Sequence, residues 1–259
     1  MSYPAWRPTV RSFAKSDIGR HRKINEDAFF RDDQIRLFIV ADGMGGHAAG
    51  EIASGEAVDT VHGMVKRGLG GLGDLYQSLS LDEVRSRAAC RLLEGAIQAA
   101  TYMVFGLAQY DKDKSGMGTT ITCALVVGDS LVTGQVGDSR IYRVRQNQAV
   151  QLTEDHTLIA WQLKQGLISE NEARNSPHKN VITRAVGNRE YVEVDTNIYP
   201  LASGDKYMLC SDGLHGYLQV DEVAAVASIG GDSAVDQFIA LANNRGGKDN
   251  ITCLLVEVA

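Results

Sequence analysis

The chain has 259 residues, of which 44% are hydrophobic and 22% are charged, and its formal net charge is −6. This length and composition are typical of a soluble globular protein, and we expect a single domain over residues 1–259. The acidic balance disfavours nucleic acid as a partner. The first residues lack the apolar core of a secretion signal, and no stretch approaches the ~18 apolar residues of a membrane span. We therefore expect a cytoplasmic protein without a membrane span and, by default, a monomer.

Apolar strands and helical segments alternate along the chain. Runs rich in β-branched and aromatic residues, separated by turn residues, predict strands at Val10–Lys15, Ala28–Arg31, Arg36–Ala41, Thr119–Val127, Leu131–Val136, Arg140–Arg145, Val192–Tyr199, Lys206–Cys210 and Ile251–Val258. Helices are expected at Ala48–Lys66, Leu81–Tyr110, Asp155–Gln165, Ser169–Asn175, Asp221–Ala227 and Asp232–Asn243. Ser80 and Glu83 have the spacing of a capping box, and Gly128 with Asp129 predicts a hairpin turn. Residues 156–182 are polar and helix-prone, which predicts a flap over the sheet edge.

The order of these elements favours one fold class. Strands that are neighbours in sequence favour antiparallel pairing. Two long helices between groups of strands favour helices packed on sheet faces rather than a series of βαβ crossovers. The residues alone therefore predict a layered α+β domain. The four cysteines include no C-x-x-C pair, which predicts reduced thiols rather than zinc ligands.

Aspartates fall at the rims of the predicted buried strands. Asp42, Asp138 and Asp212 follow the runs "LFIVA", "GQVG" and "YMLCS", and Asp249 comes just before "ITCLLVEV". Because the exits and entrances of antiparallel neighbours lie at the same edge, we expect the four carboxylates to converge. Such a cluster repels itself and needs cations, and ligation by oxygen alone selects Mg²⁺, Mn²⁺ or Ca²⁺. The alternative for each aspartate is a turn or a helix cap, because Asp-Gly is a common turn dipeptide.

The segment "DIGRHRKINED" places a cation near further acids. Arg22 comes shortly before Asn25, Glu26 and Asp27. Its guanidinium can bind phosphate oxygens, while the acids can extend a metal site. The alternative for such a basic and acidic run is a solvated loop.

The segment "GMGGHA" satisfies the G-x-G-x-x-A pattern of a dinucleotide site. A nucleotide-binding βαβ unit returns directly to a strand, whereas a second long helix follows here. We therefore expect these glycines to let the backbone approach a metal closely, with the Gly43 carbonyl as a ligand.

Eight motifs follow one another along the chain: "DIGRHRKINED", "DGMGGHAAGEIAS", "GTT", "VGDSRIY", "LTEDHT", "ITRAVG", "CSDGL" and "KDNIT". Together they resemble the metal-dependent PPM family of protein phosphatases, also called PP2C-like, in its bacterial form. They span Asp17 to Thr252. The resemblance implies a four-layer αββα sandwich of two antiparallel sheets flanked by helices. It also implies an enzyme that hydrolyses phosphoserine and phosphothreonine in phosphoproteins and opposes a bacterial Ser/Thr kinase.

The resemblance implies a role for each matching residue at two core Mg²⁺ or Mn²⁺ ions. Asp42 would bridge the two ions, and the Gly43 carbonyl would join one of them. Asp212 and Asp249 would complete the first site, and Asp27 would support the second.

The remaining roles concern a third ion, the outer contacts and the substrate. Asp138, together with Asp212, would hold the third ion. Glu26 and Asn250 would lie behind the direct ligands, with Glu26 acting through water. Arg22 would bind the substrate phosphate, and the flap would help to select substrates.

The general acid is the point at which the sequence departs from many eukaryotic relatives. Those relatives carry a histidine directly after the Asp-Gly, where this chain has Met44. His47 lies three residues further on, at the expected helix start, and does not inherit the role. Water on a metal is one candidate acid, and His156 is a weaker one, for which a hydrogen bond at a helix start is the preferred interpretation.

The mechanism that follows needs no side-chain nucleophile. Two cations about 4 Å apart lower the pKa of a bridging water and align the hydroxide for in-line attack on phosphorus. Two alternatives remain, namely a phosphatase of small phosphoesters and a non-catalytic sensor or interaction module on the same fold.

Overall fold

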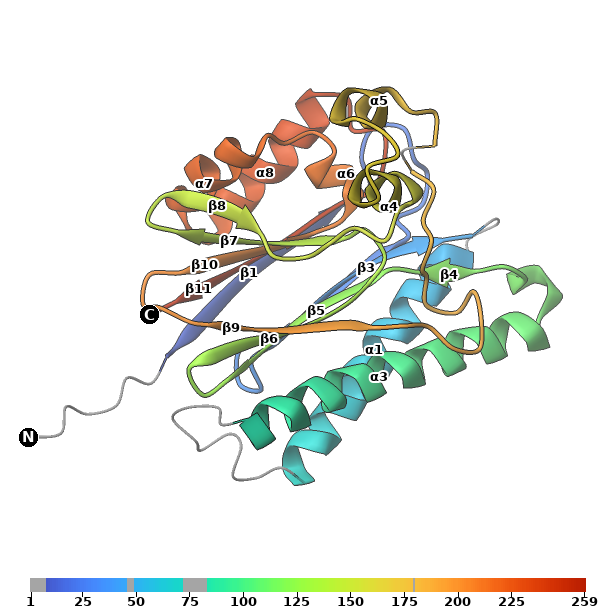
Figure 1. Ribbon diagram of the computed structural model, residues 1–259, viewed down its shortest axis with the longest axis horizontal. Coiled ribbons are helices and arrows are strands. Elements are labelled where there is room, and N and C mark those ends of the chain that lie inside the picture. The colour runs from blue at the N-terminus through green and yellow to red at the C-terminus, as the bar shows by residue number, and fades with distance from the viewer. Residues whose placement is uncertain (1–7, 46–48, 72–82, 179) are drawn as a thin grey trace, which may run out of the picture.

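The structure, a computed structural model, describes residues 8–45, 49–71, 83–178 and 180–259. Two antiparallel β-sheets lie face to face in it (Figure 1). The first sheet has the order β1 (Val10–Asp17), β11 (Ile251–Val258), β10 (Lys206–Cys210), β7 (Arg140–Arg145) and β8 (Gln148–Gln151). The second has the order β2 (Asp27–Asp32), β3 (Leu37–Met44), β5 (Ile121–Val127), β6 (Ser130–Val136) and β9 (Asp195–Pro200), and the short β4 (Gly118–Thr119) pairs with β3.

Helices cover the outer face of each sheet. The second sheet is covered by α1 (Ala49–Gly71) and α3 (Glu83–Tyr110), and the first by α7 (Val220–Ile229) and α8 (Gly231–Asn244) (Figure 1). The short helices are η1 (Lys112–Lys114), α4 (Leu158–Lys164), α5 (Glu170–Asn175) and α6 (Asp212–His215). The predicted four-layer αββα sandwich is therefore confirmed.

Strand β5 shows why the chain forms layers. All of its residues are buried. Cys123 and Leu125 contribute to the core beneath α1 and α3, whereas Ala124 and Val126 contribute to the core between the two sheets. Since successive side chains of a strand point to opposite faces, a strand that is buried at every position belongs in the middle of such a sandwich.

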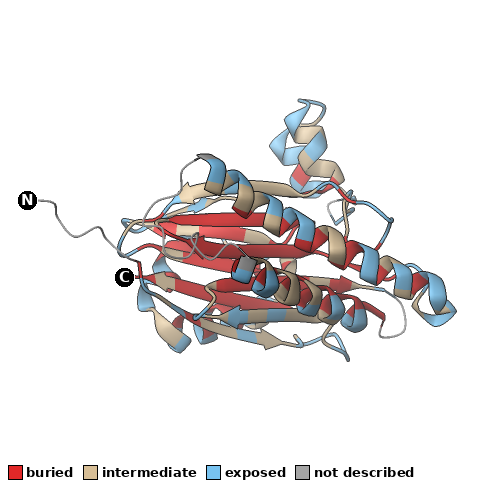
Figure 2. Cartoon of the chain, turned by 90° about the horizontal axis from the view of Figure 1, so that it is seen from below, coloured by how far each residue is buried: buried red, intermediate tan, exposed pale blue. Residues whose placement is uncertain are grey.

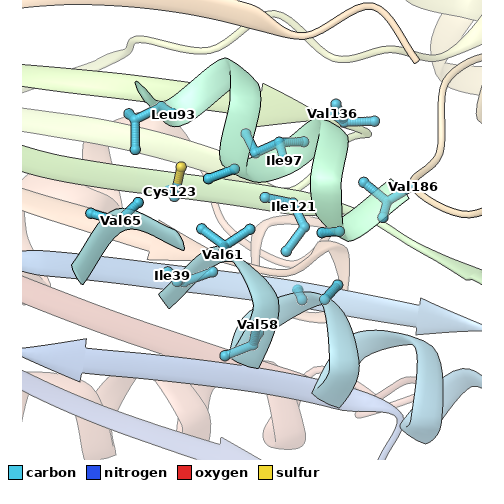
Figure 3. Packing of buried hydrophobic residues seen from close by; sticks show 14 of the residues in the cluster. Ile39, Val58, Val61, Val65, Leu93, Ile97, Ile121, Cys123, Val136 and Val186 are labelled. Atoms are coloured by element: carbon cyan, nitrogen blue, oxygen red, sulfur yellow. The ribbon is translucent and has the colours of Figure 1, made fainter. Parts of the chain in front are cut away.

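The two long helices bury one apolar stripe each. Val61 and Val65 on α1, and Leu93 and Ile97 on α3, are spaced by four residues and pack against the second sheet (Figure 3). The outward faces of these helices are largely exposed (Figure 2). Burying one such side chain stabilises the fold by about 1.5–3 kcal/mol, so the stripes attach both helices firmly to the sheet.

Several element boundaries differ from prediction for local reasons. Helix α1 continues past Lys66 into the glycine-rich segment because Leu69 is buried and Gly68 allows Leu92 of α3 to approach closely. The predicted strand from Thr119 to Val127 is interrupted at Thr120, which bonds to Asp42 instead of a ladder partner.

Two further differences concern short elements. Strand β8 was not predicted, because its four residues, QAVQ, show only a weak alternation of polar and apolar side chains. They follow a turn in which Gln146 and Asn147 have positive φ. Strand β9 begins at Asp195, three residues later than predicted.

Some predictions lie outside what the structure describes. Ser80 of the proposed capping box and His47 fall in segments outside the described residues. Within the described residues, no helix combines the length and apolarity needed to cross a membrane. The single domain, the monomeric state and the cytoplasmic location stay predictions.

Candidate metal centre and active site

The sheet topology brings acidic residues from distant parts of the chain to one end of the sandwich. Asp27 at the start of β2 lies opposite Asp42 near the end of β3. Strand β10 pairs with β11, so that Asp212 just after β10 and Asp249 just before β11 come together. Asp138 lies between β6 and β7, which belong to different sheets. Two sheets therefore supply the acidic cluster that the sequence predicted for one edge.

Hydroxyl groups connect the two sheets directly at this cluster. Ser211 Oγ, just after β10, and Thr252 Oγ1 on β11 donate hydrogen bonds to Asp27 Oδ2 at 2.8 and 2.6 Å. The other carboxylate oxygen, Asp27 Oδ1, is buried and has no hydrogen-bond partner within the described part of the chain. A buried, partnerless carboxylate oxygen is costly, so this atom calls for a ligand from outside the protein.

The charges of the cluster act on one another. Burial, followed by repulsion from Asp27 and the other aspartates, holds the pKa of Asp42 well above its usual range. Burial and then Asp212 raise the pKa of Asp138 to about 7. Burial and then Asp249 raise the pKa of Asp212, although a hydrogen bond with Asp42 opposes the shift. These carboxylates therefore resist ionisation unless a positive charge joins them.

The basic side chain expected at this site lies at its rim. Arg22 Nη2 is 2.7 Å from Asp249 Oδ2, and Arg22 Nη1 is 3.7 Å from Glu26 Oε2. The Arg22 side chain is 44% exposed, so an incoming anion can reach its guanidinium. The structure thus places one accessible fork of donors beside the acidic cluster.

The segment that carries this site is shared with known proteins. Residues 19–255 match the family model described as Protein phosphatase 2C. The chain belongs to the protein phosphatase 2C family. It is 38% identical over 248 residues to the serine/threonine phosphatase stp of Listeria welshimeri, with 94% of each chain covered. It is 34% identical over 258 residues to the serine/threonine protein phosphatase PstP of Mycobacterium tuberculosis, of which this chain spans 45%.

Solved structures of the family have the same fold. The serine/threonine phosphatase PstP/Ppp of Mycobacterium tuberculosis matches with a TM-score of 0.84 at 32% identity, covering 96% of this chain and 98% of that one. The catalytic domain of a PstP in complex with two manganese ions matches with a TM-score of 0.80 at 30% identity, covering 97% and 99%. The predictions of a bacterial PPM-type fold and of a protein serine/threonine phosphatase are confirmed.

The acidic cluster of this phosphatase fits divalent cations by its chemistry. Among the described residues, no three carboxylate, imidazole or thiol groups are already arranged as a cation cage. Asp249 instead contacts Arg22, and one oxygen of Asp27 is held by hydroxyls. The partnerless Asp27 Oδ1 and the raised pKa values of Asp42, Asp138 and Asp212 nevertheless show a need for positive charge, which a hard cation with oxygen ligands would meet.

Sequence reasoning missed the hydroxyls that hold the backbone around Asp42. The Asp42 N–H donates to Thr120 Oγ1 at 2.9 Å, and Thr120 N–H donates to the Asp42 carbonyl at 2.9 Å. Thr120 Oγ1 also lies 2.8 Å from Ser139 Oγ, next to Asp138. Thr119 Oγ1 donates to the same Asp42 carbonyl at 2.9 Å. The motifs "GTT" and "GDSR" were the only sequence signal for this network.

His215 was also missed. Its Nε2 lies 3.1 Å from the Asp138 carbonyl oxygen, which makes Nε2 the donor. Burial lowers the pKa of His215 to about 3, so the ring is neutral near pH 7. It follows Asp212 by three residues within α6, and that spacing was its only signal.

The interpretation of His156 as a helix-start residue is wrong. The N-cap of α4 is Thr157, whose Oγ1 accepts a hydrogen bond from Ala160 N–H at 3.2 Å. Both ring nitrogens of His156 lie against Gly137 and Asp195 instead. His156 therefore has no free nitrogen with which to protonate a leaving group. Met44 lies opposite Gly118 and offers no proton either.

Two residues predicted to lie behind the ligands support the loops of the site. Asn250 Oδ1 accepts from Glu26 N–H at 2.9 Å, and Asn250 Nδ2 donates to the carbonyls of Ile18 and Ile24 at 3.0 Å each. Asn250 thereby fastens the loop that carries Arg22. Glu26 also accepts at its carbonyl from Gly43 N–H at 3.1 Å.

Gly213 keeps Asp212 close to Asp249, because a Cβ there would overlap the Asn250 carbonyl oxygen. We expect Gly213→Ala to lower kcat/KM at least about tenfold and to destabilise the fold by about 1–3 kcal/mol. Peptide dephosphorylation and denaturant unfolding measure the two effects. Gly106→Ala is the control, since nothing lies within 4 Å of its Cβ and alanine should stabilise α3 by about 0.5–1 kcal/mol. Equal activity of the two variants would contradict the prediction.

Proposed function

We propose that the acidic cluster binds Mg²⁺ or Mn²⁺ and that the chain uses these ions to remove phosphate from phosphoserine and phosphothreonine in proteins. The partnerless, buried Asp27 Oδ1 supports this proposal most directly, because it lies inside a cluster of carboxylates that resist ionisation. The PstP catalytic domain in complex with two manganese ions supports two core ions here as well.

The positions of the acidic residues support a proposed set of ligands for the ions. Asp42 and the Gly43 carbonyl, at the end of β3, would serve the two core ions, with Asp212 and Asp249 on one side and Asp27 on the other. A Cβ at position 43 would overlap the carbonyls of Glu26 and Gly50, which explains a glycine there. Bound divalent cations supply Lewis acidity and acidify water.

A third ion is proposed beside Asp138. Asp138 is 6% exposed, and Asp212 is the neighbour that raises its pKa most after burial itself. Asp138 and Asp212 would therefore share this ion. Loss of Asp138 should reduce activity without emptying the two core positions, which anomalous diffraction from Mn²⁺ can establish.

The protein's own groups then act by holding and orienting. Arg22 binds the phosphoryl oxygens of the substrate and holds them over the cluster. Ser211 and Thr252 fix the orientation of the Asp27 carboxylate, since both donate to the same oxygen. Thr120 holds the Asp42 backbone from both sides. Such fixed donors and acceptors need not reorganise during the reaction.

Arg22→Ala is expected to raise KM for a phosphothreonine peptide about 10–100-fold, because hydrogen bonds to a charged group contribute about 1.5–3 kcal/mol. The change in kcat should be smaller. Lys23→Ala, which removes the neighbouring exposed cation, is the matched control and should change KM less than about threefold. If the two variants shift KM equally, Arg22 acts only through general charge and does not grip the phosphate.

The function is tested by comparing substrates. A phosphothreonine peptide, a phosphotyrosine peptide and a nucleotide are offered to the enzyme with Mn²⁺ and then with EDTA. We expect turnover of the phosphothreonine peptide to dominate and to vanish with EDTA. Preference for the nucleotide would support a small-phosphoester phosphatase, and no turnover of any substrate would support a sensor module. The physiological substrates are proposed to be proteins phosphorylated by a Ser/Thr kinase of the same cell.

A further inference from the structure

His156 lies at the point where the flap (residues 156–182) joins the body of the protein. It is 7% exposed. The backbone N–H of Gly137 donates to His156 Nδ1 of the ring at 3.1 Å. The backbone N–H of His156 donates to the Gly137 carbonyl at 3.0 Å. Gly137 is thus held on both its amide and its carbonyl by one residue. The residue that follows it is Asp138.

Both ends of the flap converge on this imidazole. Thr157 and Ile182 form an antiparallel bridge, and Thr183 N–H donates to the His156 carbonyl at 2.8 Å. Arg184, just beyond the flap, has Nη1 at 3.2 Å from His156 Nε2 and at 2.7 Å from Asp195 Oδ1. The Nε2 side of the ring therefore faces Arg184, just beyond the flap, and Asp195 on β9. The Nδ1 side faces the Asp138 loop (Gly137–Ser139).

The hydrogen bonds fix the tautomer of the ring. A backbone N–H can only donate, so His156 Nδ1 must be the unprotonated acceptor. The proton then sits on Nε2, which donates to Asp195 Oδ2 at 3.1 Å, so the 3.2 Å approach of Arg184 Nη1 to Nε2 is not a hydrogen bond. A charged imidazolium would present a second donor to the Gly137 N–H and would face the Arg184 guanidinium. The neutral ring therefore works as a directional link, accepting on one side and donating on the other.

The loop on which the ring acts has little freedom of its own. Gly137 has φ of +107°, and the Thr120 side chain lies directly against it. Gln135 Nε2 also approaches the Gly137 carbonyl, at 3.2 Å. The imidazole supplies the remaining contact, because no other group among the described residues accepts from the Gly137 N–H. A shift of this amide would rotate the peptide next to Asp138.

We propose that His156 is a positioning residue that fixes the Asp138 carboxylate from the flap base, a role that depends on the proposed function because it matters only where Asp138 binds a cation. Residues that orient metal ligands from behind commonly change metal affinity or activity about 10–100-fold when replaced. The same size of effect is expected here, although the ring of His156 contacts Gly137, Asp195 and Arg184 rather than a carboxylate of the cluster.

Two amide substitutions separate the two sides of the ring. His156→Asn places an amide oxygen near the position of Nδ1, where it can still accept from Gly137 N–H. His156→Gln places its amide near the position of Nε2 and leaves Gly137 N–H without an acceptor. Both variants lose the ring, so both carry a similar packing loss. His178→Gln, in an exposed part of the flap, controls for loss of a histidine.

The readout is Mn²⁺ binding by calorimetry on the full chain, with Asp138→Asn defining the binding component that belongs to Asp138. We expect His156→Gln to weaken that component about 10–100-fold and to lower kcat with little change in KM for a phosphothreonine peptide. His156→Asn should keep most of the Mn²⁺ affinity of that component and most of the wild-type kcat. Melting curves with EDTA ensure that all variants are folded at the assay temperature.

Equal loss in both amide variants, or wild-type binding in His156→Gln while Asp138→Asn loses the component, overturns the role of His156 and leaves the proposed function standing. An unchanged Asp138→Asn removes Asp138 from the metal site and overturns both the third ion and the role of His156, whereas the two core ions and the proposed reaction do not depend on this result. A measurement on the wild-type protein guards against unfolded variants: long-range ¹H–¹⁵N spectra should show His156 protonated at Nε2 alone. A proton on Nδ1 would overturn the inference without any substitution.

Discussion

Asp42→Asn is expected to reduce kcat for a phosphothreonine peptide by at least about 1000-fold in saturating Mn²⁺. Asparagine keeps the size of the side chain but removes the charge that both core ions would share. No neighbour can replace that charge, because Asp27, Asp138 and Asp212 already repel Asp42 and raise its pKa together with burial. The loss should appear in kcat rather than in KM, since Arg22 still binds the phosphate.

The same substitution should stabilise the metal-free protein at pH 8. A buried carboxylate surrounded by like charges destabilises the fold when it is ionised, and asparagine avoids that cost. Calorimetric melting in EDTA measures the effect. Asp59→Asn, an exposed position on α1, is the control and should change neither property. Activity within tenfold of wild type, or a lower melting temperature in EDTA, would remove Asp42 from the centre of the site.

The acidic cluster around Asp42 could be predicted from the sequence only in part. Four aspartates next to apolar runs predicted a cluster, because strand ends are readable from hydrophobic pattern alone. The pattern places Asp42 and Asp212 at strand ends, yet it does not show that β3 and β10 belong to different sheets. How the two sheets stack depends on packing across the whole core.

The hydroxyl contacts of the site were hidden for that same reason. Ser211 and Thr252 reach Asp27 only across the interface between the sheets, and their separations along the chain follow no helical or strand period. By contrast, the position of Arg22 was predictable, since it precedes Asp27 in the same loop. Contacts within one segment follow from sequence spacing, whereas contacts between layers require the fold.

The fold itself shows the same division. Strand β5 was evident from a run that is apolar except at Thr122, and α3 from its repeating apolar face. The pairing of β1 with β11, the first strand with the last, could not be derived from neighbours in sequence. That pairing matters for function, because it brings the loop after β1, with Arg22, to the loop before β11, with Asp249.

Without metal, the contribution of Asp138 to the stability of the fold is expected to decrease as pH rises, whereas bound Mn²⁺ is expected to oppose this decrease. In the metal-free fold the pKa of Asp138 is about 7, against an ordinary value of 3.8. Between these values the folded state holds a proton that the unfolded state has lost, so this group's contribution to stability decreases as pH rises through that window. A shift of this size corresponds to at most roughly 4 kcal/mol. Bound cations compete with the same proton, so Mn²⁺ should stabilise the protein more at pH 8 than at pH 6.

The effect of Asp138 must be separated from that of the histidines. His215 has a pKa of about 3 in the fold, and its contribution therefore grows as pH rises towards 6.5 and opposes that of Asp138. Subtracting the unfolding free energy of wild type from that of Asp138→Asn, both in EDTA, cancels the histidine contribution. We expect this difference to increase in favour of the variant from about pH 4 and to level off above about pH 7. With excess Mn²⁺ the difference should change sign, because only the wild-type carboxylate gains from the ion. A difference that is independent of both pH and Mn²⁺ would mean that Asp138 neither carries a raised pKa nor binds a cation.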